Sequence, residues 1–69
     1  MPIVMAPVNR ELKIVKIIAD EKVKKHLENL GFIVGDRVNV ITEQNGNIIV
    51  KVKESRIAIS REMAMKIYV

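Results

Sequence analysis

Cysteine and tryptophan are missing from this sequence, and aromatic residues of any kind are scarce. Among 69 residues there is no Cys, no Trp, one Phe and one Tyr. Without cysteine the chain forms neither a disulfide nor a thiolate zinc site, which is consistent with a reducing compartment. With so few aromatics, the chain lacks the aromatic groove that binds proline-rich peptides and the platforms on which single-stranded nucleic acid stacks.

Groups that carry enzyme chemistry are equally sparse. The chain has one histidine, His26, and two serines, Ser55 and Ser60, and it has neither a Walker-type phosphate loop nor a G-x-G-x-x-G motif. Catalysis needs a positioned nucleophile or acid–base pair in a pocket, whereas both serines stand where turns and helix caps favour Ser. We therefore expect no catalytic residue and no cofactor, so the protein is predicted not to be an enzyme.

His26 is the only candidate metal ligand of the nitrogen type. A helical metal site would place a second His or a carboxylate four residues later, but Leu30 stands there, and Glu21 lies on another face. We expect His26 to be an ordinary half-exposed helix residue, and we expect no metal site.

Length and charge set the remaining bounds. The 69 residues suffice for one domain, 1–69, and Lys plus Arg exceed Asp plus Glu by 12 to 8, giving a net charge of +4. Such a balance suits an acidic partner, or it simply keeps the surface soluble. The apolar start, residues 1–8, is too short to span a bilayer, and Pro2 and Pro7 oppose a helix there. We expect a cytoplasmic domain whose N-terminal segment is extended and pairs with or covers the rest.

The clearest local signal is a helix that begins after Asp20. Asp20 is a favoured N-cap, and the negative charge of Glu21 suits the first turn. Gly31 suits the left-handed position after the helix, which places Phe32 against Leu27 in a Schellman cap. The apolar stripe of this helix consists of Val23, Leu27 and Leu30.

Strand-like segments flank this helix. Residues 12–18 are rich in β-branched side chains but do not alternate cleanly, so they are either bulged or covered on both faces. Residues 37–43 and 47–53 do alternate. The Asn45-Gly46 pair between them favours a two-residue turn, but that turn would set Val40 opposite Lys51. We expect a three-residue loop, 44–46, which sets Val40 opposite Val50 instead.

The last third of the chain predicts a turn, a strand, a helical turn and a final strand. We expect the turn at residues 54–55, Ile57 opposite Val52, Ser60 as an N-cap, and the final strand at residues 67–69. Together the elements predict a mainly β fold of about five strands, with one short helix inserted after the first strand and a helical turn before the last. Such a sheet buries its inner face by curling into a small, partly open SH3-like barrel.

Two surfaces are candidates for partner binding. In the expected register, Ile41 and Ile49 form an outward apolar pair with a basic rim, a common arrangement in protein interfaces. The alternative is that residues 3–5 cover this pair. The lysines near the start of the helix form either a solvated face or a second docking surface for an acidic protein. The candidate residues are Arg37, Ile41, Ile49, Lys51, Lys53, Lys24 and Lys25.

The stretches 14–40 and 47–69 resemble the FeoA family, and the similarity covers nearly the whole chain from Met5. Its most specific elements are Leu27, Leu30-Gly31, Gly35, Val38, residues 56–60, Ala64 and residues 67–69. Members of this family are small cytosolic SH3-like proteins that accompany the ferrous iron transporter FeoB. The resemblance implies a non-enzymatic accessory role in ferrous iron uptake, through contact with a cytosolic part of FeoB.

Two alternatives remain at this point. The first is an SH3-like module that binds nucleic acid through its basic surface, although the modest charge and the lack of aromatics argue against it. The second is a homo-oligomer formed by edge pairing through residues 67–69. We expect no insertion into a membrane in either case.

Overall fold

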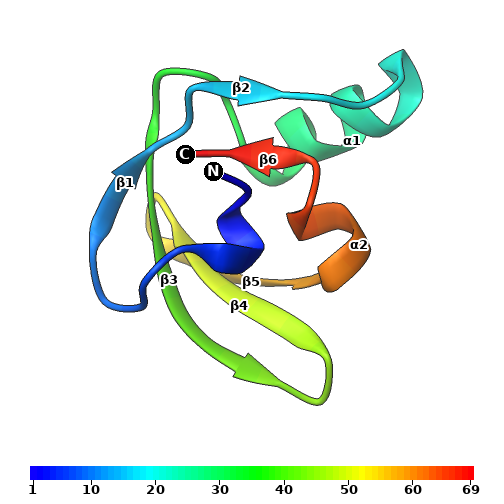
Figure 1. Ribbon diagram of the computed structural model, residues 1–69. Helices are drawn as coiled ribbons and strands as arrows, with labels where there is room; N and C mark the ends of the chain where they lie inside the picture. The colour runs from blue at the N-terminus through cyan, green and yellow to red at the C-terminus, as the bar shows by residue number, and fades with distance from the viewer.

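The computed structural model describes all residues, 1–69, and contains two small antiparallel sheets around one core (Figure 1). The larger sheet has the strand order β1-β3-β4-β5, and the smaller one pairs β2 with β6. In chain order the elements are the 3-10 helix η1 (Ile3–Met5), β1 (Glu11–Lys13), β2 (Lys16–Ile17), α1 (Glu21–Leu30), β3 (Arg37–Gln44), β4 (Asn47–Val52), β5 (Ser55–Ser60), α2 (Arg61–Ala64) and β6 (Ile67–Tyr68).

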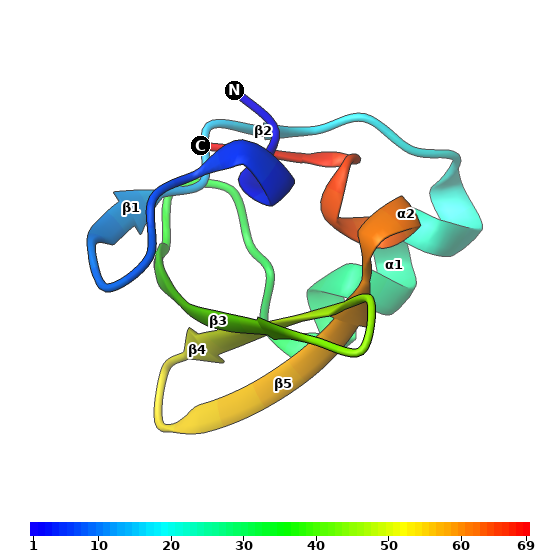
Figure 2. The ribbon, with the colours of Figure 1, turned by 60° about the horizontal axis from the view of Figure 1, so that its bottom comes forward.

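The core lies between the two sheets and contains only hydrophobic side chains. It has 13 buried residues, and no polar or charged residue is buried. Figure 2 shows the curled sheet on one side of this core and η1 with β6 on the other. The predicted mainly β, partly open barrel is confirmed, with six strands because the first expected strand divides in two.

The division occurs at Ile14 and Val15, where the chain passes from one sheet to the other. The Ile14 N–H donates to the Asp36 carbonyl at 2.9 Å, on the side of β3, and the Val15 N–H donates to the Tyr68 carbonyl at 2.8 Å, beside β6. The irregular alternation of residues 12–18 therefore reflects a strand that serves two sheets in succession.

The predicted caps of both helices are confirmed. An Asp20 carboxylate oxygen accepts a 2.9 Å hydrogen bond from the Val23 N–H at the start of α1. At its end Gly31 has φ 109°, and the Phe32 N–H donates to the Leu27 carbonyl at 2.9 Å, which is the Schellman pattern. The side chains of Phe32 and Leu27 are both fully buried. The Ser60 hydroxyl accepts from the Met63 N–H at 3.1 Å and so caps α2.

The hairpin of β3 and β4 corrects the expected loop. The turn contains only Asn45 and Gly46, both with positive φ, and not three residues. Val40 nevertheless faces Val50, because the register shifts by one residue between Val40 and Thr42. An extra residue inside one strand repairs the inward–outward alternation as well as an extra loop residue does. The predicted pairing of Val40 with Val50 is confirmed, but a β-bulge in β3 produces it and not a third loop residue.

The hairpin of β4 and β5 also differs from expectation. The turn lies at Lys53 and Glu54, one residue earlier than expected, and Lys53 has φ 56°. Ile57 consequently faces Val50, not Val52. A shift of two positions keeps every side chain on its own face, so alternation alone does not distinguish the two registers.

The N-terminal segment pairs with β6 and enters the core. Pro2 forms an antiparallel β-bridge with Tyr68. The Met1 amino group donates to the Val69 carbonyl at 2.9 Å, and the Val69 N–H donates to the Met1 carbonyl at 2.9 Å. Residues 3–5 form the helical turn η1, so the segment is not extended throughout, and the Ile3 side chain is fully buried.

With β2 on one side and Met1–Pro2 on the other, β6 has no open edge. A homo-oligomer paired through residues 67–69 would have to displace one of these contacts, and that alternative stays a prediction. No helix of the structure is both long and apolar enough to cross a membrane.

Candidate protein-binding surface

The outward side chains of the larger sheet stand in rows across its strands. The register places Asn39 beside Glu11 on one side and Lys51 on the other, and Lys51 beside Arg56. These residues alternate with buried neighbours such as Val38 and Val50, so they lie on the solvent face. We call this row the cation row after its two basic members, Lys51 and Arg56; it consists of Glu11, Asn39, Lys51 and Arg56.

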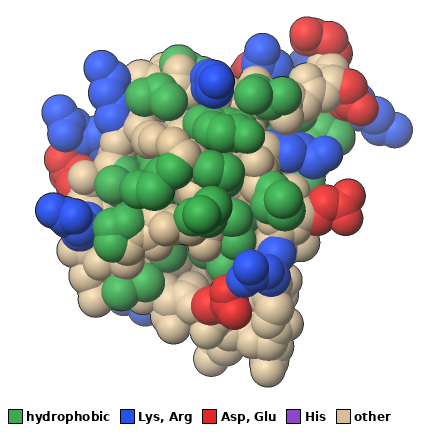
Figure 3. Space-filling view, viewed as in Figure 1, with side chains coloured by type: hydrophobic (Ala, Val, Ile, Leu, Met, Phe, Trp, Pro, Cys, Tyr) green, Lys and Arg blue, Asp and Glu red, His purple; other side chains and the backbone are tan.

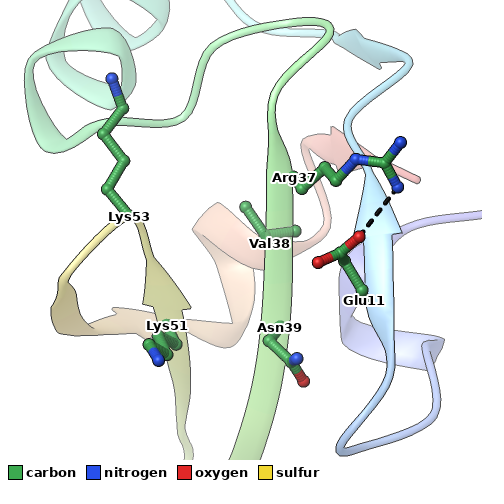
Figure 4. A pocket seen from close by; sticks show the side chains of 6 residues that line it. All are labelled: Glu11, Arg37, Val38, Asn39, Lys51 and Lys53. Carbon is green, nitrogen blue, oxygen red and sulfur yellow. Dashed lines mark hydrogen bonds and ion pairs between the residues drawn. The ribbon is translucent and has the colours of Figure 1, made fainter.

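A shallow depression of about 260 Å³ lies on this solvent face, towards the end of the sheet where β3 begins and β4 ends. Figure 4 shows side chains from β1, β3, β4 and the turn that follows β4 around it. Its lining consists of Glu11, Arg37, Val38, Asn39, Lys51 and Lys53. Three of the basic residues expected at a partner site, Arg37, Lys51 and Lys53, thus come together here.

Carboxylates satisfy some of these cations and leave others unpaired. The Arg37 guanidinium meets the Glu11 carboxylate at 2.9 Å, and the Lys53 amino group lies 3.7 Å from an Asp36 carboxylate oxygen. The side chains in both pairs are between 43% and 66% exposed to solvent, so each pair adds little to the stability of the fold. Lys51 and Arg56 form no ion pair.

Like charges stand directly opposite each other at two places on this face. Lys13 of β1 faces Arg37 of β3, and Lys51 of β4 faces Arg56 of β5. Directly opposed like charges destabilise an antiparallel sheet. The fold therefore concentrates positive charge on one face at a local energetic disadvantage.

The sequence did not single out Glu11, Asn39 or Arg56 as part of this surface. The first expected strand began at Leu12, and nothing local shows that β1 pairs with β3. Two signals were available: the register that sets Val40 opposite Val50 also sets Asn39 opposite Lys51, and the alternation of Arg56 with Ile57 places Arg56 on the solvent face of β5.

The aliphatic residues of the expected site are arranged differently from the prediction. Ile41 and Ile49 are both half-buried, but they do not face each other, because the bulge sets Thr42 opposite Ile49. On the other side Ile49 faces Ala58, which is exposed. The alternative, in which residues 3–5 cover this pair, does not match the structure either, since η1 packs against α2 and Ile3 lies in the core.

The lysines of α1 belong to a different surface. Lys24 is half-buried, Lys25 is exposed, and neither lines the depression or forms an ion pair. His26 is exposed on the same helix, and no group of three His, Cys, Asp or Glu side chains is placed to hold a metal ion.

A separate apolar surface covers the side of the molecule that carries η1 and β6, as Figure 3 shows. Met1, Val15 and Ile18 each form backbone hydrogen bonds with the β6 segment and are more than half exposed. Met5 is 71% exposed. Figure 2 places this side across the barrel from β4 and β5, the strands that carry Lys51 and Arg56.

Comparison with known proteins places the fold in a family. The whole chain, residues 1–69, matches the FeoA domain. The chain belongs to the FeoA family. A relative in Methanocaldococcus jannaschii, named "Putative Fe(2+) transport protein A", is 38% identical over 68 residues, which cover 99% of this chain and 83% of the relative.

Solved structures of FeoA proteins share the fold. A crystal structure of an iron uptake regulatory protein, FeoA, superposes with a TM-score of 0.87 at 23% identity, over 96% of this chain and 88% of the other. FeoA of Stenotrophomonas maltophilia, solved with zinc and described as an SH3 domain protein, gives a TM-score of 0.83 at 19% identity, over 99% and 87% of the two chains. The expected SH3-like fold is confirmed.

Proposed function

We propose that this chain is a non-enzymatic accessory protein of ferrous iron uptake, which acts by contact with the cytosolic part of an FeoB-type transporter. The observation that carries the proposal is the FeoA match over the whole chain, joined to a relative named for Fe(2+) transport. The solvent face of the larger sheet supports it, because exposed, unpaired cations beside half-buried aliphatic residues are typical of a protein contact.

The test is direct binding to the transporter. The purified chain is titrated by calorimetry against the soluble GTP-binding domain of FeoB and against full-length FeoB in detergent. We expect Ile49→Asp and Lys51→Glu to weaken binding, and the matched control Lys22→Glu, which makes the same charge change on α1, to leave it unchanged. If neither form of FeoB binds the wild-type chain, the proposal is wrong.

The nucleic-acid alternative makes a different prediction. It requires an affinity for oligonucleotides that falls steeply as salt increases. Phe32 is fully buried, and the Lys16 amino group lies over the Tyr68 ring, 5.0 Å from its centre. Neither ring is therefore available on the sheet face. Base stacking, on which single-strand binders depend, therefore has no platform there.

A further inference from the structure

We propose that the solvent face of β3, β4 and β5 binds an extended acidic segment of a partner protein, and that Glu11 occupies the position of a partner carboxylate in the free chain. The inference deepens the proposed function, because it names the chemistry of the contact. It does not depend on which protein supplies the segment.

The first argument is electrostatic. Lys51 and Arg56 face each other across β4 and β5 without a carboxylate partner. A carboxylate placed between them relieves a repulsion that the free protein carries, in addition to forming its own ion pairs. A partner gains more from such a site than from an equal number of isolated surface lysines.

The second argument is the spacing of the rows. Ile49 and Ala58 form an apolar row that lies two residues along the strands from Lys51 and Arg56, on the same face. Two residues of extended chain span about 7 Å in either molecule. An extended segment that runs along the strands therefore matches both rows when an acidic residue and an aliphatic residue stand two positions apart.

The third argument is the Glu11–Arg37 pair. Glu11 lies in the same row as Lys51. Its carboxylate forms an ion pair with the Arg37 guanidinium, with an N–O distance of 2.9 Å, on the rim of the depression. The two side chains are 63% and 66% exposed, so the pair opens readily to a competitor. A partner carboxylate replaces Glu11 on Arg37 with little change in the sheet.

A protein segment fits this face better than a nucleic acid does. The apolar row beside the cations suits aliphatic side chains, which a phosphodiester backbone does not have. No aromatic side chain stands on the face to stack a base.

The experiment uses the full chain and a fluorescent acidic peptide in which each Glu stands two positions from a Leu. The control peptide has the same composition, with each Glu next to a Leu, so that the two side chains point to opposite faces of an extended strand. We expect the first peptide to bind more tightly by about fivefold or more. Equal affinity for the two peptides overturns the spacing argument.

Variants then locate the site. We expect Lys51→Glu with Arg56→Glu to weaken binding by about tenfold, and Lys51→Gln with Arg56→Gln to weaken it by less. The control Lys16→Glu with Lys22→Glu has the same net charge, uses exposed lysines outside the candidate residues, and keeps wild-type affinity. If the control loses as much as the first pair, the effect is one of net charge and the proposed site is wrong.

Glu11→Gln is expected to raise the affinity for the peptide, whereas the substitutions of Lys51 and Arg56 lower it. Freeing Arg37 strengthens peptide binding by about two- to fivefold, whereas Glu28→Gln, the same charge change on α1, does not. No gain with Glu11→Gln, or tighter binding of a single-stranded oligonucleotide than of the peptide, overturns the proposal. If the transporter binds but the peptide does not, the proposed accessory role stands and the proposed acidic-segment site is wrong. If the peptide binds but the transporter does not, the acidic-segment site stands and the proposed contact with FeoB is wrong.

Discussion

Gly31 and Val52 meet where α1 ends against the larger sheet. A Cβ atom on residue 31 would lie 2.9 Å from Cγ1 of Val52, closer than real Cβ contacts come. Gly31 also has φ 109°, a conformation that L side chains rarely adopt. One glycine thus both ends the helix and lets it approach β4, which links the local cap to the packing of the barrel.

Gly31→Ala is expected to lower the free energy of unfolding by about 2 to 4 kcal/mol, because backbone strain and the clash with Val52 add. The control is Gly35→Ala, where φ is 97° but a Cβ meets no atom within 4 Å. There we expect about 1 to 2 kcal/mol from strain alone. Urea unfolding followed by circular dichroism measures both, and equal losses would show that the clash relaxes.

The N-terminal segment is expected to contribute to stability through one side chain. Ile3 is fully buried in the core, whereas Met5, two residues later, is 71% exposed. Ile3→Ala should destabilise the fold by about 2 to 4 kcal/mol, and Met5→Ala should change it by less than about 0.5 kcal/mol. Thermal and urea unfolding test the pair; a small effect of Ile3→Ala would mean that this segment detaches without cost.

The N-cap of α1 is expected to depend on a hydrogen bond and not on charge. Asp20→Ala removes the acceptor of the Val23 N–H and should cost about 1 kcal/mol. Asp20→Asn keeps an acceptor oxygen and should stay within about 0.5 kcal/mol of wild type. The comparison is made by urea unfolding at neutral pH, and a similar loss in both variants would indicate that the negative charge is what matters.

The β3–β4 turn is expected to tolerate glycine but not alanine. Asn45 has φ 52° and Gly46 has φ 80°. Gly46→Ala forces a side chain into the left-handed region and should cost about 1 to 2 kcal/mol, whereas Asn45→Gly should stay within about 0.5 kcal/mol. Urea unfolding measures both variants, and an unchanged free energy of unfolding in Gly46→Ala would contradict the left-handed conformation of residue 46.

Local chemistry in the sequence determined the helices and the faces of the strands. The cap residues Asp20, Gly31 and Ser60 act on backbone groups within a few positions, so their roles follow from neighbours alone. The inward faces of β3, β4 and β5 follow in the same way from alternation, and Val40 does face Val50. The FeoA resemblance, carried by residues spread over the chain, agrees with the family match.

Only the tertiary structure decided how these pieces meet. The inward–outward alternation of side chains does not say whether an extra loop residue or a bulge at Ile41 keeps the valines of β3 and β4 on one face. It also does not distinguish two registers that differ by two residues, as at Ile57. The pairing of Glu11 with Asn39, and hence the cation row, joins segments far apart in the chain. The sequence lists the charges, but their repulsion across the sheet exists only once the long-range pairing brings them together, because electrostatic interactions depend on distance in space and not on separation along the chain.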